Sequence, residues 1–121
     1  MIEVIEGLPD GVVGLEAVGE VTADDYERVA TPAIEHARAG RDKVRLLYVV
    51  GDRFERYTAG AMWDDAKLGM SHPFSWERIA VVTDEGAMRA SVKGLGWLIP
   101  GHVRVFEISE LVDAKAWVSG E

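Results

Sequence analysis

The chain has 121 residues, no cysteine and a formal net charge of −8 at pH 7. A chain of this length is expected to form one domain, residues 1–121, with a core that needs no covalent staples. The lack of cysteine excludes disulfides, thiolate catalysis and cysteine-ligated metals, and the acidic balance disfavours binding to nucleic acid and electrostatic recruitment to anionic lipid.

The chain opens with strand-like sequence and not with a targeting segment. Residues 1–8 and 12–20 are strand-like runs separated by Pro9-Asp10-Gly11, which favours a tight turn, so a β-hairpin is predicted. No basic stretch precedes an apolar one, and no apolar run approaches the ~18 residues of a membrane-spanning helix. These features predict a cytoplasmic protein whose contact with a membrane is at most peripheral.

A helix is expected after the hairpin. Thr22 can begin it, with Asp25 in the acidic position of a capping box, and apolar residues then recur at helical spacing. Pro32 lies inside this pattern and removes a backbone donor, which predicts a kink or a split. Gly40 is placed to end the helix.

The apolar run Val44–Val50 is the predicted centre of the sheet. Six of its seven residues are apolar, which is typical of a parallel strand buried on both faces. The charged stretch Gly51–Tyr57 predicts a loop after this strand. Thr58 is then placed to begin a second helix, whose apolar stripe extends to Met70.

The rest of the chain alternates strands and helices. Arg78–Thr83 is a second buried strand, and Asp84 can begin a third helix over residues 86–98. Val103–Phe106 is the last strand, and Ser109 can begin a final amphipathic helix.

The predicted order is therefore β-β-α-β-α-β-α-β-α, an α/β fold. Strands joined through helices pair in parallel, with right-handed crossovers, whereas the N-terminal hairpin adds an antiparallel strand. We expect a mixed, mostly parallel β-sheet with helices packed on it.

Five stretches carry a resemblance that extends along nearly the whole chain. They are Gly19-Glu20-Val21-Thr22-Ala23-Asp24-Asp25-Tyr26, Trp63-Asp64-Asp65, Arg78-Ile79-Ala80-Val81-Val82, Val105-Phe106 and Ala114-Lys115-Ala116-Trp117. In this order they resemble the SpoIIAA-like family, bacterial relatives of the STAS domain that are also described as SEC14-like. The resemblance implies a STAS-like mixed sheet with helices packed against it.

The resemblance also implies two kinds of function. Better-known STAS domains are anti-sigma-factor antagonists, switched by phosphorylation of a serine in an Asp-Ser-x-Gly pattern after the central strand. Here Tyr57-Thr58-Ala59-Gly60 keeps the hydroxyl-x-Gly spacing but replaces the aspartate with tyrosine, which weakens the case for a phospho-switch at Thr58. The SpoIIAA-like branch instead implies apolar ligands and peripheral membrane association.

No residue set predicts catalysis, a metal site or a cofactor. The sequence lacks a Gly-x-Ser-x-Gly elbow, a Walker loop and a dinucleotide fingerprint. His36, His72 and His102 lack ligand spacing. Asp64 and Asp65 are neighbours on a helix and point about 100° apart, so they cannot act as a paired acid and base. The chain is not predicted to be an enzyme.

Aromatic and apolar side chains gather around the second helix and define the candidate ligand site. They are Phe54, Tyr57, Met62, Trp63, Leu68 and Trp97. The plainest interpretation is that these side chains are ordinary core. The first functional interpretation is a pocket between the second and third helices for an apolar small molecule or lipid. The alternatives are a protein-interaction module that docks a partner through the Thr58 region and a homodimer formed through the second helix. Basic residues at the other end of the central strand, Arg38, Arg41, Lys43 and Arg45, are expected to be solvated surface.

Overall fold

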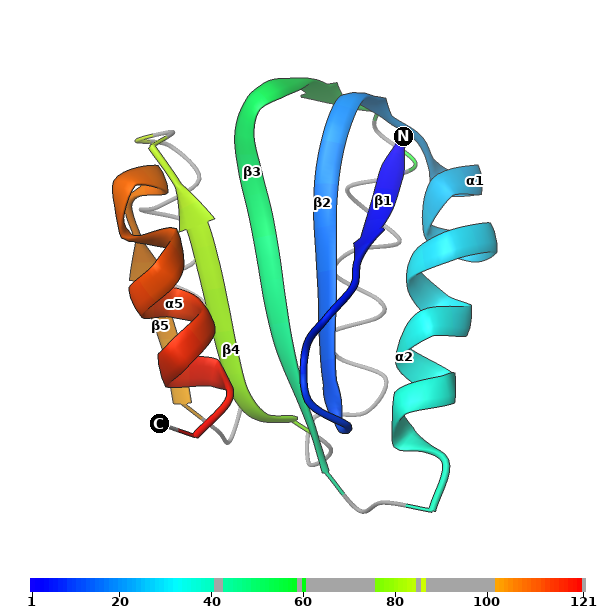
Figure 1. The fold of residues 1–121 in the computed structure, drawn as a ribbon. Helices are drawn as coiled ribbons and strands as arrows, with labels where there is room; N and C mark the ends of the chain where they lie inside the picture. Colours follow the sequence, from blue (N-terminus) through cyan, green and yellow to red (C-terminus); the bar gives the residue numbers. More distant parts are fainter. Residues whose placement is uncertain (41–42, 59, 61–75, 85, 87–101, 121) are drawn as a thin grey trace.

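The computed structural model describes residues 1–40, 43–58, 60, 76–84, 86 and 102–120. Within them a five-stranded sheet has the spatial order β1-β2-β3-β4-β5 (Figure 1). Its strands are β1 (Ile2–Ile5), β2 (Val12–Val21), β3 (Val44–Tyr57), β4 (Trp76–Thr83) and β5 (His102–Phe106). The β1–β2 pair is antiparallel and the other pairs are parallel, which confirms the predicted mixed sheet.

Helices pack on both faces of the sheet. On one face, Tyr26, Ala30 and Ile34 of the first helical segment join a core with inward side chains of β2, β3 and β4. On the other face, Ala114 and Val118 of α5 (Leu111–Val118) pack on Leu47, Val49, Ala80, Val82 and Phe106. Successive side chains of β3 therefore enter opposite cores, and its apolar run is buried on both faces as predicted.

The first helical segment is split where Pro32 predicts it. Thr22 is the N-cap, α1 covers Ala23–Asp25, a π-helical turn covers Tyr26–Ala30, and α2 covers Thr31–Arg38. In the π-helical turn the Thr31 N–H donates to the Tyr26 carbonyl, five residues back. Proline has no N–H to donate, and its ring would clash with a carbonyl four residues earlier, so a wider turn before Pro32 accommodates the ring.

The predicted loop Gly51–Tyr57 is wrong, because these residues continue β3. They pair with the end of β2, where Gly19 lies opposite Phe54 and Val21 lies opposite Tyr57. The register shifts along this pairing, so β3 contains extra residues in bulges. The charged side chains of the segment are exposed while Phe54 and Tyr57 are half-buried. The sequence of this segment is rich in charge because this part of the strand has one face in water, and such a sequence is also typical of a loop.

The predicted start of the last helix at Ser109 is also wrong. Glu107 is the N-cap of a 3₁₀ turn, Ile108–Glu110, that leads into α5. The Glu107 N–H donates to Glu110 Oε1 at 2.8 Å, and the Ile108 N–H donates to Asp84 Oδ1 at 3.0 Å. Since side-chain carboxylates already satisfy these amides, the N-cap is Glu107, two residues before Ser109. The predicted second and third helices fall mostly outside the described residues, although Gly60 and Gly86 are helical.

Basic residues of the sheet hold the C-terminal end of α5. Arg45 Nη1 donates to the Val118 carbonyl at 3.2 Å, and Arg78 Nη1 donates to the Trp117 carbonyl. These are carbonyls that a helix leaves without an internal partner. Arg45 also pairs with Glu77 and is half-buried, so the prediction that it is merely solvated surface is wrong.

Candidate functional site

The candidate site lies at the carboxyl ends of β2 and β3, where ligands commonly bind in sheets of this kind. The predicted lining residues Phe54 and Tyr57 meet here, with ring centroids 4.8 Å apart and planes inclined at 49°. The bulged pairing of β3 brings both side chains toward the core under α1 and the π-helical turn, although they are three residues apart. Met62, Trp63, Leu68 and Trp97, the other predicted lining residues, lie outside the described part of the chain.

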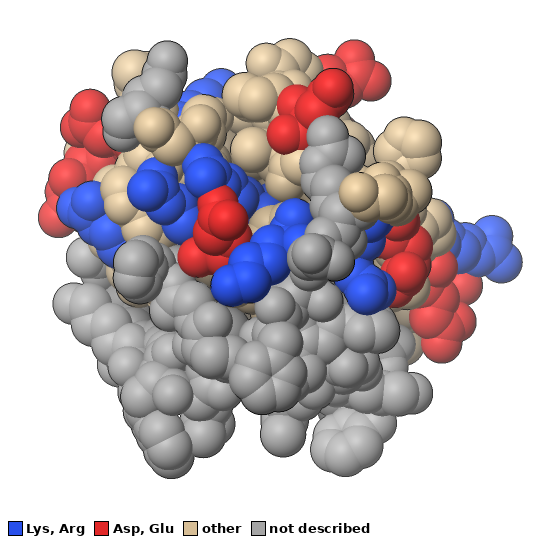
Figure 2. Space-filling model, turned by 90° about the horizontal axis from the view of Figure 1, so that it is seen from below, with Lys and Arg blue, Asp and Glu red and all other residues tan. Residues whose placement is uncertain are grey.

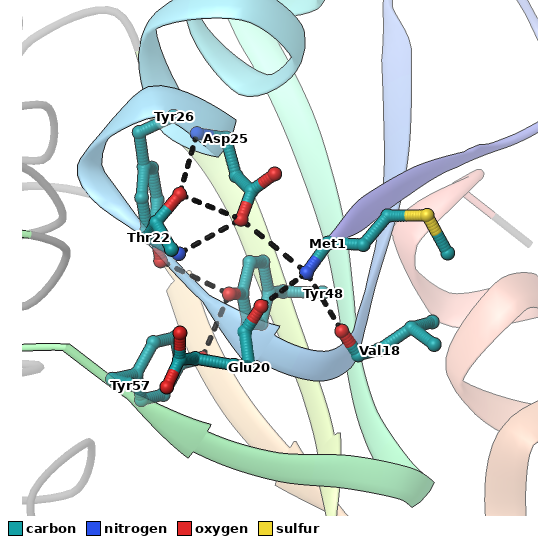
Figure 3. Close-up of polar contacts among 8 residues, drawn as sticks. All are labelled: Met1, Val18, Glu20, Thr22, Asp25, Tyr26, Tyr48 and Tyr57. Carbon is teal, nitrogen blue, oxygen red and sulfur yellow. Dashed lines mark hydrogen bonds and ion pairs between the residues drawn. The ribbon is translucent and has the colours of Figure 1, made fainter.

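Tyr57 also belongs to a chain of three tyrosine hydroxyls (Figure 3). Tyr48 Oη lies 3.0 Å from Tyr26 Oη and 2.7 Å from Tyr57 Oη. Tyr26 comes from the π-helical turn, whereas Tyr48 and Tyr57 both come from β3. Tyr26 and Tyr48 are buried, so their hydroxyls need such partners. The chain connects the helical layer to both halves of β3.

This chain of tyrosine hydroxyls was not predicted from the sequence. Tyr26 is interpretable from sequence as one apolar helix position, and Tyr48 as one residue of a buried strand. The available signal was chemical: a buried tyrosine usually finds a partner for its hydroxyl, whereas phenylalanine needs none. Tyrosines at two predicted core positions, together with Tyr57, indicate that some buried hydroxyls bond to each other. They do not indicate which tyrosines are partners.

A capping box lies next to the tyrosines (Figure 3). Asp25 Oδ2 accepts from the Thr22 N–H at 2.8 Å and from the Thr22 hydroxyl at 3.0 Å, while the Asp25 N–H donates to Thr22 Oγ1. The Met1 amine lies 3.3 Å from the same carboxylate and donates to the Val18 carbonyl at 2.7 Å. Burial alone would raise the pKa of Asp25, but the hydrogen bonds from Thr22 and the nearby amine outweigh it and lower that pKa.

Thr58, the candidate phospho-switch, follows the last residue of β3. Its N–H donates to the Val21 carbonyl at 2.9 Å, which ties the start of the next segment to the end of β2. Two residues on, a Cβ built on Gly60 would lie 3.3 Å from the Cβ of Ala23. The chain after β3 therefore passes close to the start of α1, and Thr58 is half-buried at that junction.

The described residues offer no arrangement for metal chemistry. Among them no three His, Asp or Glu side chains come close enough to hold a metal ion. Likewise, no helix in the described ranges has both the length and the apolar character to cross a membrane. Within the described residues the site consists of the Phe54–Tyr57 ring contact and of the hydroxyl contacts that join Tyr57 to Tyr48 and Tyr48 to Tyr26.

The fold and this site define a mixed-sheet α/β domain of the regulatory STAS type. The SpoIIAA-like family model matches residues 12–119, so the chain belongs to the SpoIIAA-like family. Domains of this family are typically not enzymes. The chain is also similar to an uncharacterized protein of the DUF3478 family from Shewanella loihica PV-4, whose crystal structure has a SpoIIAA-like fold. The two are 28% identical over 98% of this chain and 92% of the other, with a TM-score of 0.76. No curated protein matches the chain.

Proposed function

We propose that this chain is a non-enzymatic cytoplasmic binding domain that takes an apolar small molecule or lipid at the carboxyl end of β3, with at most peripheral contact to a membrane. The observation that carries the proposal is the Phe54–Tyr57 pair, which lies next to the tyrosine hydroxyl chain. An aromatic surface favours an apolar body, and the adjacent hydroxyls can orient one polar group. Met62, Trp63, Leu68 and Trp97 complete the proposed lining.

The cost of an empty pocket constrains how such a site works. A cavity of about 300 Å³, the small end of ligand sites, would cost roughly 7 kcal/mol at ~24 cal/mol per Å³. The whole domain is stabilised by only ~5–15 kcal/mol. A dry, open cavity is therefore a poor resting state. The domain either keeps a ligand through purification or closes the space when the ligand leaves.

Native mass spectrometry of the purified protein, followed by denaturation in the same instrument, tests this. A hydrophobic mass that leaves on denaturation is the expected result. Phe54→Ala should lower the liganded fraction, while Val112→Ala, at a position of α5 that is 79% exposed, should not. A bare mass in the wild-type protein, together with unchanged tryptophan emission across a panel of fatty acids and neutral lipids, would overturn the proposal.

Partner binding through the Thr58 region is the second candidate. It is favoured by the regulatory class of the fold and by the place of Thr58, whose backbone links the end of β2 to the segment after β3. A phosphate there would change the charge at this junction. Phosphopeptide mapping of protein from cell extracts tests it, and a Thr58 that is never phosphorylated would count against a switch. Light scattering separates both candidates from a homodimer formed through the second helix.

A further inference from the structure

The opposite end of the molecule carries a separate feature, which we call the basic edge: Lys43, Arg45, Arg78 and Arg104. Because β3, β4 and β5 are parallel, their amino ends share one edge of the sheet. Arg45 lies directly opposite Arg78 in register. Arg104 lies on the next strand opposite Ala80, two residues further along the sheet than Arg78. Figure 2 looks onto this end and shows the blue side chains as a band interrupted by acidic ones.

The basic edge is unusual in a chain of net charge −8. A groove of about 220 Å³ begins beside it and is lined by Pro9, Asp10, Gly11, Val12, Lys43, Arg45, Glu77 and Ser119. The edge and groove together hold four cations and two carboxylates, those of Asp10 and Glu77. Like charges opposite each other on neighbouring strands repel. Glu77 offsets part of this repulsion by pairing with Arg45, whereas Arg78 has no carboxylate partner among the described residues.

Contacts with α5 hold the guanidinium groups in position but use few of their donors. Arg78 and Arg104 lie over the Trp117 ring, with guanidinium carbons 5.3 and 5.4 Å from its centroid. Arg78 donates to one helix carbonyl, while Arg104 makes only ring contacts within the described part of the chain. An arginine has five N–H donors in a fixed fork that matches a carboxylate. Donors fixed before binding cost less entropy to engage.

We propose that the basic edge and its groove form a docking surface for an acidic peptide segment of a partner protein. Carboxylates of the segment would pair with Arg104, Arg78 and Lys43, and one or two of its side chains would enter the groove. The proposal concerns the end of the sheet opposite to Tyr57, so it stands apart from the ligand proposed there.

The charge distribution favours a short peptide over a larger polyanion. Attraction to the edge acts within a Debye length of about 8 Å in physiological salt. A DNA duplex or an anionic membrane carries dense charge over a wide area and would also meet the net negative charge of the chain. Asp10 and Glu77 would lie against such phosphates in the groove. A peptide can place its few carboxylates on the arginines and avoid both acids.

Fluorescence anisotropy with a fluorescein-labelled octaglutamate peptide in 150 mM salt tests the proposal. Saturable binding is expected, with Lys43→Gln/Arg104→Gln weakening it at least about fivefold through loss of two exposed charge pairs. The matched control, Arg28→Gln/Arg56→Gln, removes the same charge from exposed residues remote from the edge and should change affinity less than about twofold. Lys43→Glu alone should also weaken binding. This variant keeps the contact between Arg104 and Trp117, so it tests the proposal even if the double variant folds poorly.

Three outcomes would overturn the docking surface. The first is an absence of saturable binding to the wild-type protein. The second is an equal loss in the control variant, which would show that only total charge matters. The third is binding of a 20-base-pair duplex or of phosphatidylserine-containing vesicles as tight as that of the peptide, which would identify a polyanion surface instead.

Discussion

The hydroxyl of Tyr48 lies 2.7 Å from that of Tyr57, nine residues further along the same strand. In a regular strand nine residues span about 30 Å, a distance that two tyrosine side chains cannot bridge. β3 therefore bends sharply between them, and Figure 1 shows it curving over the end of β2. The register shifts opposite Ala17 and Gly19 are where the pairing accommodates this bend. The short contact thus reports the geometry that brings Phe54, Tyr57 and Thr58 back over the sheet.

Removing the middle hydroxyl of the chain should cost more stability than removing an end one. Tyr48→Phe deprives both Tyr26 and Tyr57 of a partner in a buried region, so we expect a loss of roughly 1–3 kcal/mol in the free energy of unfolding. Tyr57→Phe breaks one contact of a half-buried residue and should cost about 1 kcal/mol. Urea denaturation monitored by circular dichroism measures both. Equal losses would contradict the central place of Tyr48 in the hydroxyl chain.

The Asp25 carboxylate should make stability depend on acidity. Its pKa is lower in the folded chain than its ordinary value of 3.8, so the folded state favours the ionised form. The contribution is fully present above pH 3.8 and is lost as pH falls below that value through the folded pKa. Asp25→Asn should remove this dependence and cost about 1 kcal/mol at neutral pH, because the neutral amide loses the ion pair with the Met1 amine and the charge of the capping-box acceptor. Denaturation curves from pH 7 to pH 2 measure it, and an unchanged acid limb in the variant would contradict the assignment.

Much of the fold was predictable because local chemistry specifies it. The Thr22–Asp25 capping box, the split before Pro32 and the doubly buried Val44–Val50 each follow from one short pattern and one physical rule. The extension of β3 was not predictable in this way. Its charges favour a loop when the segment is considered alone, and only pairing with Gly19–Val21 makes it a strand.

The same distinction applies to the site. Phe54 and Tyr57 were identifiable because aromatic residues concentrate in that stretch, and the structure brings them into contact. The hydroxyl chain depends on a residue of the first helix meeting two residues of β3, a long-range relationship that periodicity does not encode. Arg45 was misjudged for a similar reason, because its helix partner lies 73 residues away.

Arg45 should contribute more to stability than an exposed arginine in a local ion pair. Arg45→Met leaves the Val118 carbonyl without its donor and Glu77 without its cation, at a half-buried position. We expect a loss of about 1–2 kcal/mol. The control Arg28→Met breaks only an exposed pair with Asp24 in adjacent helical turns and should cost at most about 0.5 kcal/mol. Thermal and urea denaturation compare the two variants, and similar losses would remove the helix-capping role of Arg45.

Replacement of Gly14 in β2 should destabilise the fold through a steric clash. A Cβ added there would lie 2.6 Å from Leu8 Cδ1 and 2.8 Å from Ile5 Cβ, because the hairpin loop closes directly over this position. Gly14→Ala must displace Leu8 or the end of β1, at a cost of about 1–3 kcal/mol. Gly51→Ala in β3 is the matched control, since its nearest neighbours would lie 4.0 Å away. Relief of glycine's backbone entropy should make that change neutral or stabilising by up to ~1 kcal/mol. The changes in the free energy of unfolding caused by the two substitutions should therefore differ in sign or by at least ~1 kcal/mol. Equal changes would show that Leu8 does not pack on Gly14 in solution.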